Sequence, residues 1–151
     1  FADQVVVMQD GEVVQIGTPV ELFERPQHTF VGHFIGSPGM NVLPVSEDAG
    51  RVTFEGHTVA LEGAVNGQGG STELGIRPEF VSIADTGLEA RVRKISDVGR
   101  HSVVEAMVGD TAVKAIIEGA APEQGAAVHL NFAQDQTRLY RDGWIATEVS
   151  S

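Results

Sequence analysis

The chain has 151 residues and a formal net charge of −11 at pH 7, and 42% of its residues are hydrophobic. This length allows a real core in one domain, or in one small domain with a tail. The acidic balance argues against nucleic-acid binding, which needs a clustered basic surface. The absence of cysteine excludes disulfides and thiolate metal sites. No apolar run approaches the roughly 18 residues of a membrane-spanning helix.

A β-hairpin is the first element that the sequence predicts. Two apolar runs, Val5–Met8 and Val13–Ile16, flank the dipeptide Asp10-Gly11. Asp-Gly between β-branched runs favours a type I′ turn, in which both central residues have positive φ.

Two short helices are expected next. Thr18-Pro19-Val20-Glu21 is a capping box with proline at the first helical position, and Pro26 ends that helix. The apolar residues of Thr29–Ile35 recur at helical spacing. Gly36 and the turn that follows then end the second helix, so we expect a domain boundary near residue 40.

Short strands dominate the rest of the chain, residues 41–151. A flexible glycine-rich loop is predicted at 63–70, and many short strands separated by turns favour a β-barrel or sandwich. Arg91 and Arg93 are expected on one face of a long strand, with Ala90, Val92 and Lys94 on the other. The expected strands are Val42–Val45, Arg51–Phe54, Thr58–Leu61, Thr72–Ile76, Val81–Ile83, Leu88–Ile95, His101–Val108, Ala112–Ile117, Ala127–Phe132, Thr137–Tyr140 and Trp144–Glu148.

Two stretches carry a resemblance to a known family. The opening hairpin and helix, which close on Phe34-Ile-Gly-Ser-Pro-Gly-Met-Asn41, resemble the end of the nucleotide-binding domain of ABC transporter ATPases of the carbohydrate-import class. Leu74-Gly-Ile-Arg-Pro-Glu-Phe80 resembles the Gly-Ile-Arg-Pro-Glu element of the regulatory domain of these ATPases. The resemblance implies a mainly β fold. A β-hairpin and two short helices (1–40, the tail of the nucleotide-binding domain) precede a transport-associated OB-type β-barrel regulatory domain (41–151).

The resemblance also implies a function for the parent protein. It would bind ATP and Mg²⁺, and it would work as a homodimer under transmembrane permease subunits at the inner, cytoplasmic face of the membrane. It would energise import of sugars, sugar alcohols or glycerol phosphate. The chain begins at Phe1 within the family pattern, and it has no Gly-x-x-x-x-Gly-Lys-Ser/Thr loop, ATPase signature or Asp-Glu magnesium motif. We therefore expect a regulatory fragment that is not itself an enzyme and holds no cofactor.

Candidate interaction residues follow from the same stretches. Five belong to the proline element: Gly75, Ile76, Arg77, Pro78 and Glu79. Pro78 restricts the residues before it to extended geometry, and Arg77 could pair with Glu79 or with a neighbouring chain. A plain structural corner is the simpler interpretation of this element. Phe30, Phe34 and Ile35 are expected to pack on the ATPase core of the parent. A fragment without that core is expected to form a homodimer or a swapped assembly through residues 1–36.

Other chemistries have weaker support. The histidines at 28, 33, 57, 101 and 129 do not show metal-site spacing, and the acid pairs fall in predicted turns. We expect no catalytic or metal-binding residue. The alternative function is a free-standing OB-type barrel that binds an oxyanion such as molybdate, or a small sugar.

Overall fold

The computed structural model describes residues 4–36 and 38–148. The strands of the first half are β1 (Val5–Gln9), β2 (Glu12–Gly17), β3 (Asn41–Pro44), β4 (Ser46–Asp48), β5 (Arg51–Phe54), β6 (His57–Val59), β7 (Ala64–Val65) and β8 (Thr72–Ile76). Those of the second half are β9 (Val81–Ala84), β10 (Leu88–Asp97), β11 (His101–Val108), β12 (Thr111–Glu118), β13 (Ala127–Phe132), β14 (Arg138–Arg141), β15 (Trp144–Ile145) and β16 (Thr147–Glu148). The helices are α1 (Pro19–Glu24), α2 (Thr29–Phe34) and the 3₁₀ helices η1 (Pro78–Phe80) and η2 (Gln134–Gln136).

The hairpin and the capping box confirm the predictions for the opening segment. β1 pairs antiparallel with β2, and both turn residues have positive φ, 52° at Asp10 and 81° at Gly11. The Thr18 hydroxyl accepts from the Glu21 N–H, and the Glu21 carboxylate accepts from the Thr18 N–H, each at 3.2 Å. These two bonds satisfy donors that the first turn of α1 cannot pair internally.

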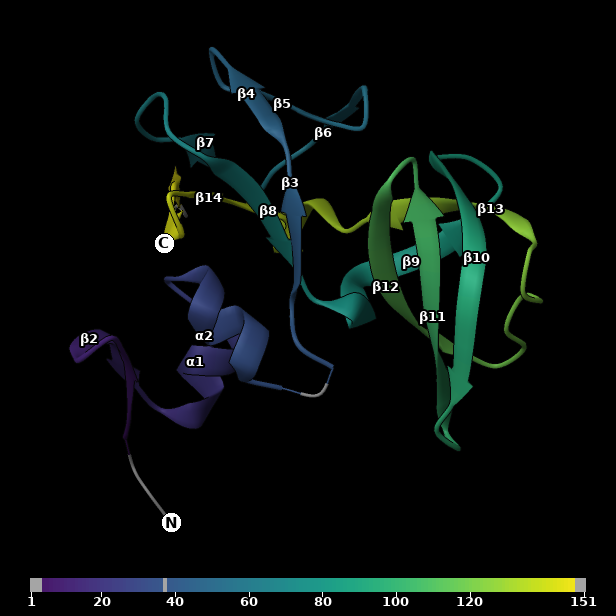
Figure 1. Ribbon diagram of the computed structural model, residues 1–151, viewed down its shortest axis with the longest axis horizontal. Coiled ribbons are helices and arrows are strands. Elements are labelled where there is room, and N and C mark those ends of the chain that lie inside the picture. Colours follow the sequence, from purple (N-terminus) through teal and green to yellow (C-terminus); the bar gives the residue numbers. More distant parts are fainter. Residues whose placement is uncertain (1–3, 37, 149–151) are drawn as a thin grey trace.

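Five strands form the larger β unit, which lies on the right in Figure 1. Their order is β12-β11-β10-β13-β9, and every pair is antiparallel. The sheet curls so that β12 also contacts β9 and η1, which gives it the form of a barrel. This unit, with the predominance of strands elsewhere, confirms the expected mainly β fold.

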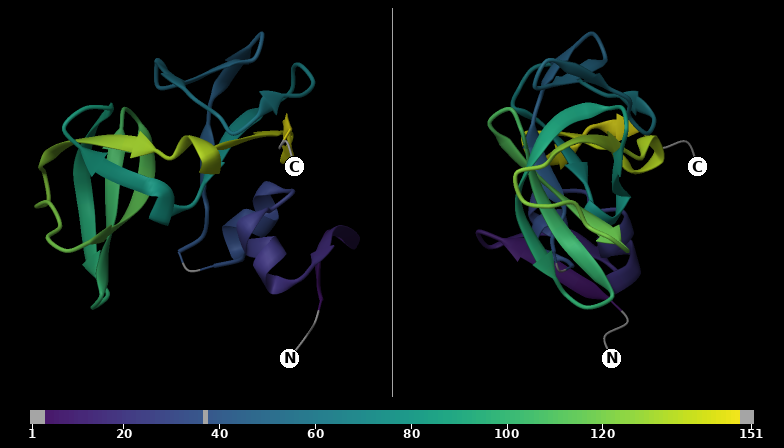
Figure 2. Two further views of the ribbon diagram at one scale, coloured as in Figure 1. Left: turned by 180° about the vertical axis from the view of Figure 1, so that it is seen from behind. Right: turned by 90° about the vertical axis from the view of Figure 1, so that its right-hand side faces the viewer.

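A second sheet lies beside the barrel and carries the helices. Its strand order is β15-β14-β8-β3, and β4, β5 and β6 form a separate meander above it (Figure 1). Both views in Figure 2 place α1 and α2 under this four-stranded sheet, with the β1–β2 hairpin further out.

One hydrophobic core joins the two β units. It includes Leu43, Phe54, Leu74 and Ile76 from the first half and Val81, Leu88, Ala106, Val113, Leu130 and Leu139 from the second. The side-chain amide of Asn41 in β3 connects the second sheet to β12 of the barrel. The Asn41 amide donates to the backbone carbonyl of Lys114 and accepts from its N–H, both at 2.9 Å, as a neighbouring strand would.

Three details differ from the sequence-based expectations. The predicted loop at 63–70 contains the short strand β7. The predicted strand Trp144–Glu148 is two strands, β15, which pairs with β14, and β16, which pairs with β7. β4 was not predicted. Lys94 is exposed and does not share the buried face of Ala90 and Val92, because a β-bulge between Val92 and Lys94 shifts the register of β10. The proposed boundary near residue 40 stays a prediction.

Candidate functional site

Arg77 joins the ends of both helices to β8. Its Nε donates to the carbonyl of Phe23 in α1, and its Nη1 donates to the carbonyl of Ile35 at the end of α2, both at 2.8 Å. Its guanidinium carbon lies 3.9 Å from the centre of the Phe23 ring. The last carbonyls of a helix have no intrahelical partner and carry partial negative charge, so one arginine can cap two helix ends.

Two further side chains of the sheet bind the same segment. Arg138 Nη1 donates to the Glu24 carbonyl at 2.9 Å, and its Nε lies 3.2 Å from the Glu62 carboxylate. The Tyr140 hydroxyl donates to the carbonyl of Pro26 at 2.7 Å. Arg138 and Tyr140 are both buried. The carbonyls of Phe23, Glu24 and Pro26 therefore accept hydrogen bonds from Arg77, Arg138 and Tyr140 in place of solvent.

His28 fixes the start of α2 against the β14–β15 turn. Its Nδ1 accepts from the Phe30 N–H at 3.0 Å, so the imidazole is the N-cap of α2. Its ring meets the Trp144 ring edge-on, with centroids 4.7 Å apart. Backbone bonds from Thr29 to Gly143 (2.9 Å) and from Ile145 to Gln27 (2.8 Å) complete the contact.

Burial shifts the pKa of three side chains where the helices meet the sheet, namely His28, Arg77 and Tyr140. It lowers the pKa of His28, an effect that the charge of Glu73 partly opposes. It also lowers the pKa of Arg77, and it raises the pKa of Tyr140 because the phenolate would be desolvated. Burial is the largest cause of all three shifts.

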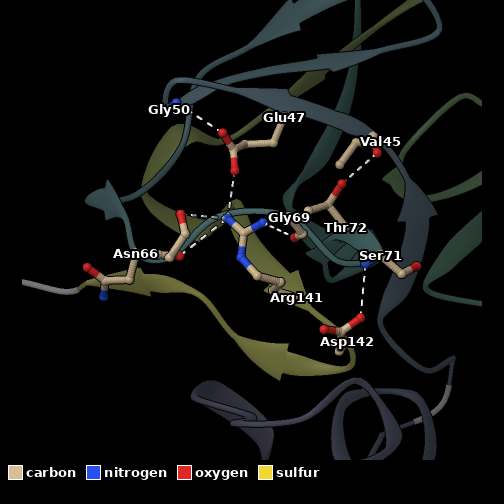
Figure 3. Close-up of polar contacts among 10 residues, drawn as sticks. Val45, Glu47, Gly50, Asn66, Gly69, Ser71, Thr72, Arg141 and Asp142 are labelled. Carbon is tan, nitrogen blue, oxygen red and sulfur yellow. Dashed lines mark hydrogen bonds and ion pairs between the residues drawn. The ribbon is translucent and has the colours of Figure 1, made fainter.

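Arg141 organises a second polar cluster at the other end of β14, shown in Figure 3. Its Nη2 lies 2.6 Å from the Glu47 carboxylate and also donates to the carbonyls of Asn66 (3.3 Å) and Gly67 (3.2 Å), while Nη1 donates to the carbonyl of Gly69. Hydrogen bonds from Arg141 and from the Gly50 N–H lower the pKa of Glu47. The loop predicted to be flexible is therefore held by one arginine. Sequence analysis missed Arg141, because its partners are 72 to 94 residues away.

The proline element lies at the junction of the helices and the sheet. Gly75 has no room for a side chain, because a Cβ there would strike Tyr140 and Met40. Ile76 is in the core, and Pro78 is buried at the first position of η1. Glu79 is exposed and does not pair with Arg77, whose described hydrogen bonds go to Phe23 and Ile35 instead.

The apolar residues of the opening segment divide between two environments. Phe30 and Ile35 are half-buried, whereas Phe34 is 65% exposed and contacts Phe30 with ring centroids 4.7 Å apart and the rings tilted by 45°. One face of the hairpin pairs Val6 with Ile16 and Met8 with Val13. We call these four side chains the hairpin face, and each is more than half exposed.

Among the described residues, no group of three histidine, cysteine or acidic side chains could hold a metal ion. No helix in the described ranges is long and apolar enough to cross a membrane.

Comparison with known proteins identifies the fold. The MalK OB fold domain matches residues 36–81, and the TOBE domain matches residues 74–139. An uncharacterised ABC transporter ATP-binding protein, y4oS of Sinorhizobium fredii, is 39% identical over 122 residues, which cover 78% of this chain and 33% of that protein.

Two import proteins are also similar to this chain. The sn-glycerol-3-phosphate import ATP-binding protein UgpC 2 of Agrobacterium fabrum is 37% identical over 138 residues (87% of this chain, 37% of that protein). UgpC of Chromohalobacter salexigens is 48% identical over 91 residues (60% and 24%). The chain spans about a third of the length of the curated relatives that it matches.

The fold and these matches define an OB-type domain of the kind found in transport ATPases. The chain contains a MalK OB fold domain and a TOBE domain, and its homologues match it over the C-terminal part of import ATP-binding proteins.

Proposed function

We propose that this chain is the regulatory C-terminal part of an ABC importer ATP-binding subunit and that it holds two such subunits together. The observation that carries the proposal is the pair of consecutive domain matches over residues 36–139, together with the sn-glycerol-3-phosphate import proteins among the relatives. In the whole protein, ATP and Mg²⁺ would bind to a nucleotide-binding domain that lies outside these 151 residues. Residues 1–40 would be the tail of that domain, and 41–151 the regulatory domain.

The hairpin face supports the expected attachment to that nucleotide-binding domain. Val6, Met8, Val13 and Ile16 expose apolar side chains on one side of an isolated two-stranded sheet, and Phe34 is exposed on α2. Such a surface favours a covering partner. We propose that the nucleotide-binding core covers it, while Arg77, Arg138 and Tyr140 transmit the position of α1 and α2 to the regulatory domain.

The surroundings of the whole protein follow from the same proposal. It would lie on the cytoplasmic side of the membrane, bound to two transmembrane permease subunits, and it would energise import of glycerol phosphate, a sugar or a sugar alcohol. The alternative, a free-standing barrel for molybdate or a sugar, has less support. The barrel interior is filled by apolar side chains such as Val81, Val113 and Leu130, each at most 1% exposed.

A chimaeric transporter tests the proposal. This chain would replace the C-terminal third of UgpC 2 of Agrobacterium fabrum in cells that lack that subunit, and uptake of labelled sn-glycerol 3-phosphate would be measured. We expect uptake well above that of a subunit truncated at the same point.

A control chimaera would carry the corresponding third of UgpC from Ruegeria pomeroyi, which is 36% identical to this chain. If the control chimaera transports and the chimaera with this chain, at equal expression, does no better than the truncation, the proposed function is wrong.

A further inference from the structure

A cavity of about 230 Å³ lies between the end of α1 and the sheet that α1 covers. Its walls come from α1 and the residues after it, from β8 and η1, and from η2 and β14. The polar residues that matter here are Arg25, Arg77, Gln136 and Arg138, and the aromatic ones are Phe23 and Phe80. The cavity is therefore apolar on part of its wall and cationic on another.

The arginines give this cavity wall a positive charge, although the chain as a whole is acidic. Arg77 and Arg138 are only 5% and 7% exposed, in a protein whose net charge is −11. Arg138 has a carboxylate partner, Glu62. Within the part of the chain that the structure describes, no carboxylate lies within 4.0 Å of Arg77, and its Nη2 has no hydrogen-bond partner. The charge of the exposed Glu79 acts on Arg77 only from beyond ion-pair distance. Buried charges are normally paired, so a guanidinium with no contacting carboxylate at a cavity wall is a candidate anion ligand.

The remaining polar groups fit the same ligand. Arg25 is exposed at the end of α1, and it adds a third positive charge to the wall. Gln136 offers an amide N–H₂ group that makes no side-chain hydrogen bond within the described residues. Glu24 also lines the cavity and is exposed like Arg25, so solvent screens both of these charges more than it screens the two buried arginines.

We propose that this cavity binds a small organic anion, in which one carboxylate or phosphate group is attached to a short apolar body. The anionic group would lie among Arg77, Arg138, Arg25 and the Gln136 amide, since guanidinium groups bind oxyanions in a fixed, forked geometry. The apolar body would pack between Phe23 and Phe80.

The position of the site gives binding a structural consequence. The two buried arginines that would hold the anion also bind the carbonyls of Phe23, Glu24 and Ile35. A ligand that binds only the folded junction raises its stability by mass action. Anion binding would therefore strengthen the attachment of the helices to the regulatory domain.

Calorimetric titration of the whole chain tests this site with four probes: phenyl phosphate, benzoate, inorganic phosphate and the neutral benzyl alcohol. We expect saturable binding of phenyl phosphate or benzoate, and the comparison of the two identifies the preferred anionic group. Inorganic phosphate should bind more weakly because it lacks the apolar body, and benzyl alcohol should not compete. The result that overturns the site is no saturable binding of either organic anion up to about 10 mM, or equal binding of benzyl alcohol.

Two variants locate the binding without disturbing the helix caps. Gln136→Glu adds a negative charge to the cavity wall, and Gln68→Glu adds the same charge on the exposed loop after β7. We expect Gln136→Glu to weaken binding at least tenfold and Gln68→Glu to leave it unchanged. Equal affinity in both variants would place the anion elsewhere and overturn the proposal. The chimaera experiment tests importer function separately, because it measures transport by the whole subunit and not binding of phenyl phosphate or benzoate to this chain.

Discussion

The guanidinium carbon of Arg77 lies 3.9 Å from the centre of the Phe23 ring, and Nε of the same side chain donates to the Phe23 carbonyl. These residues are 54 positions apart, and they join the Gly-Ile-Arg-Pro-Glu element to the first helix. A third contact, from Arg77 Nη1 to the Ile35 carbonyl, brings the second helix into the same arrangement.

Replacing Arg77 should loosen both helices at once. In Arg77→Met two helix-end carbonyls lose their buried donors, so the free energy of unfolding should fall by about 2 to 3 kcal/mol. Arg77→Lys should recover little, because an ammonium cannot reproduce the forked geometry. Urea denaturation measures both losses. Arg51→Met is the matched control: Arg51 is exposed, and among the described residues its side chain bonds to Thr58 alone, so the loss should stay below about 1 kcal/mol. Equal losses at 51 and 77 would contradict the double cap.

Tyr140 should resist ionisation while the chain is folded. Burial raises its pKa, so the protonated phenol contributes stability below the unfolded pKa of about 10, and that stability is lost as pH rises further. Tyr140 is the only tyrosine, so phenolate absorbance reports it alone. We expect no phenolate signal until the chain unfolds in alkali. In Tyr140→Phe the hydrogen bond to Pro26 is lost, and stability at neutral pH should fall by about 1 kcal/mol. A normal titration near pH 10 in the folded chain would contradict the buried contact.

His28 should make the helix attachment weaker in acid. Its pKa is lowered in the folded state, so the unfolded chain binds protons more readily, and stability falls as pH drops below the unfolded value of 6.5. Protonation also removes the Nδ1 acceptor for the Phe30 N–H. His28→Asn keeps a capping side chain that does not titrate in this range. We therefore expect a smaller difference in unfolding midpoint between about pH 5.5 and 7.5 in His28→Asn than in the natural sequence. Equal pH dependence in both proteins would show that the other histidines, and not His28, carry the effect.

Arg141 should set the rigidity of the loop at 66–70. Arg141→Met keeps the apolar stem but removes the donors to the carbonyls of Asn66, Gly67 and Gly69. Amide hydrogen exchange in this loop should then become faster, while exchange in β10 and β11 stays unchanged. Gln68→Ala, in the same loop, is the control with no expected effect. Slow exchange in the loop of Arg141→Met would show that glycine geometry and β7 pairing are enough to hold it.

Local signals in the sequence predicted the local structure well. The Asp10-Gly11 turn and the capping box of Thr18 and Glu21 depend only on residues that are close in sequence, and the structure confirms both. The spacing of the short strands predicted a barrel or a sandwich, and the family resemblance implied the barrel. For Arg77, however, the sequence left two partners open, Glu79 or a neighbouring chain, and within this chain it bonds to carbonyls 54 and 42 residues earlier. Every residue has a backbone carbonyl, so the sequence does not indicate which carbonyls will accept a side-chain hydrogen bond. The bonds of Arg77, Tyr140 and Arg141 to distant carbonyls could therefore not be predicted. The bulge in β10 could not be predicted either, because it depends on the register of the neighbouring strand.

Self-association of the chain tests the central claim most directly, namely that this domain pairs importer subunits. The measurement is light scattering of residues 1–151 at about 100 µM, where even a micromolar contact would be mostly formed. We expect a mass at least twice the 16.0 kDa of one chain. The double variant Val6→Asp, Ile16→Asp should keep this mass if the regulatory domains pair, and should reduce it if the hairpin face alone causes the association. A single-chain mass for the natural sequence at this concentration would contradict the account.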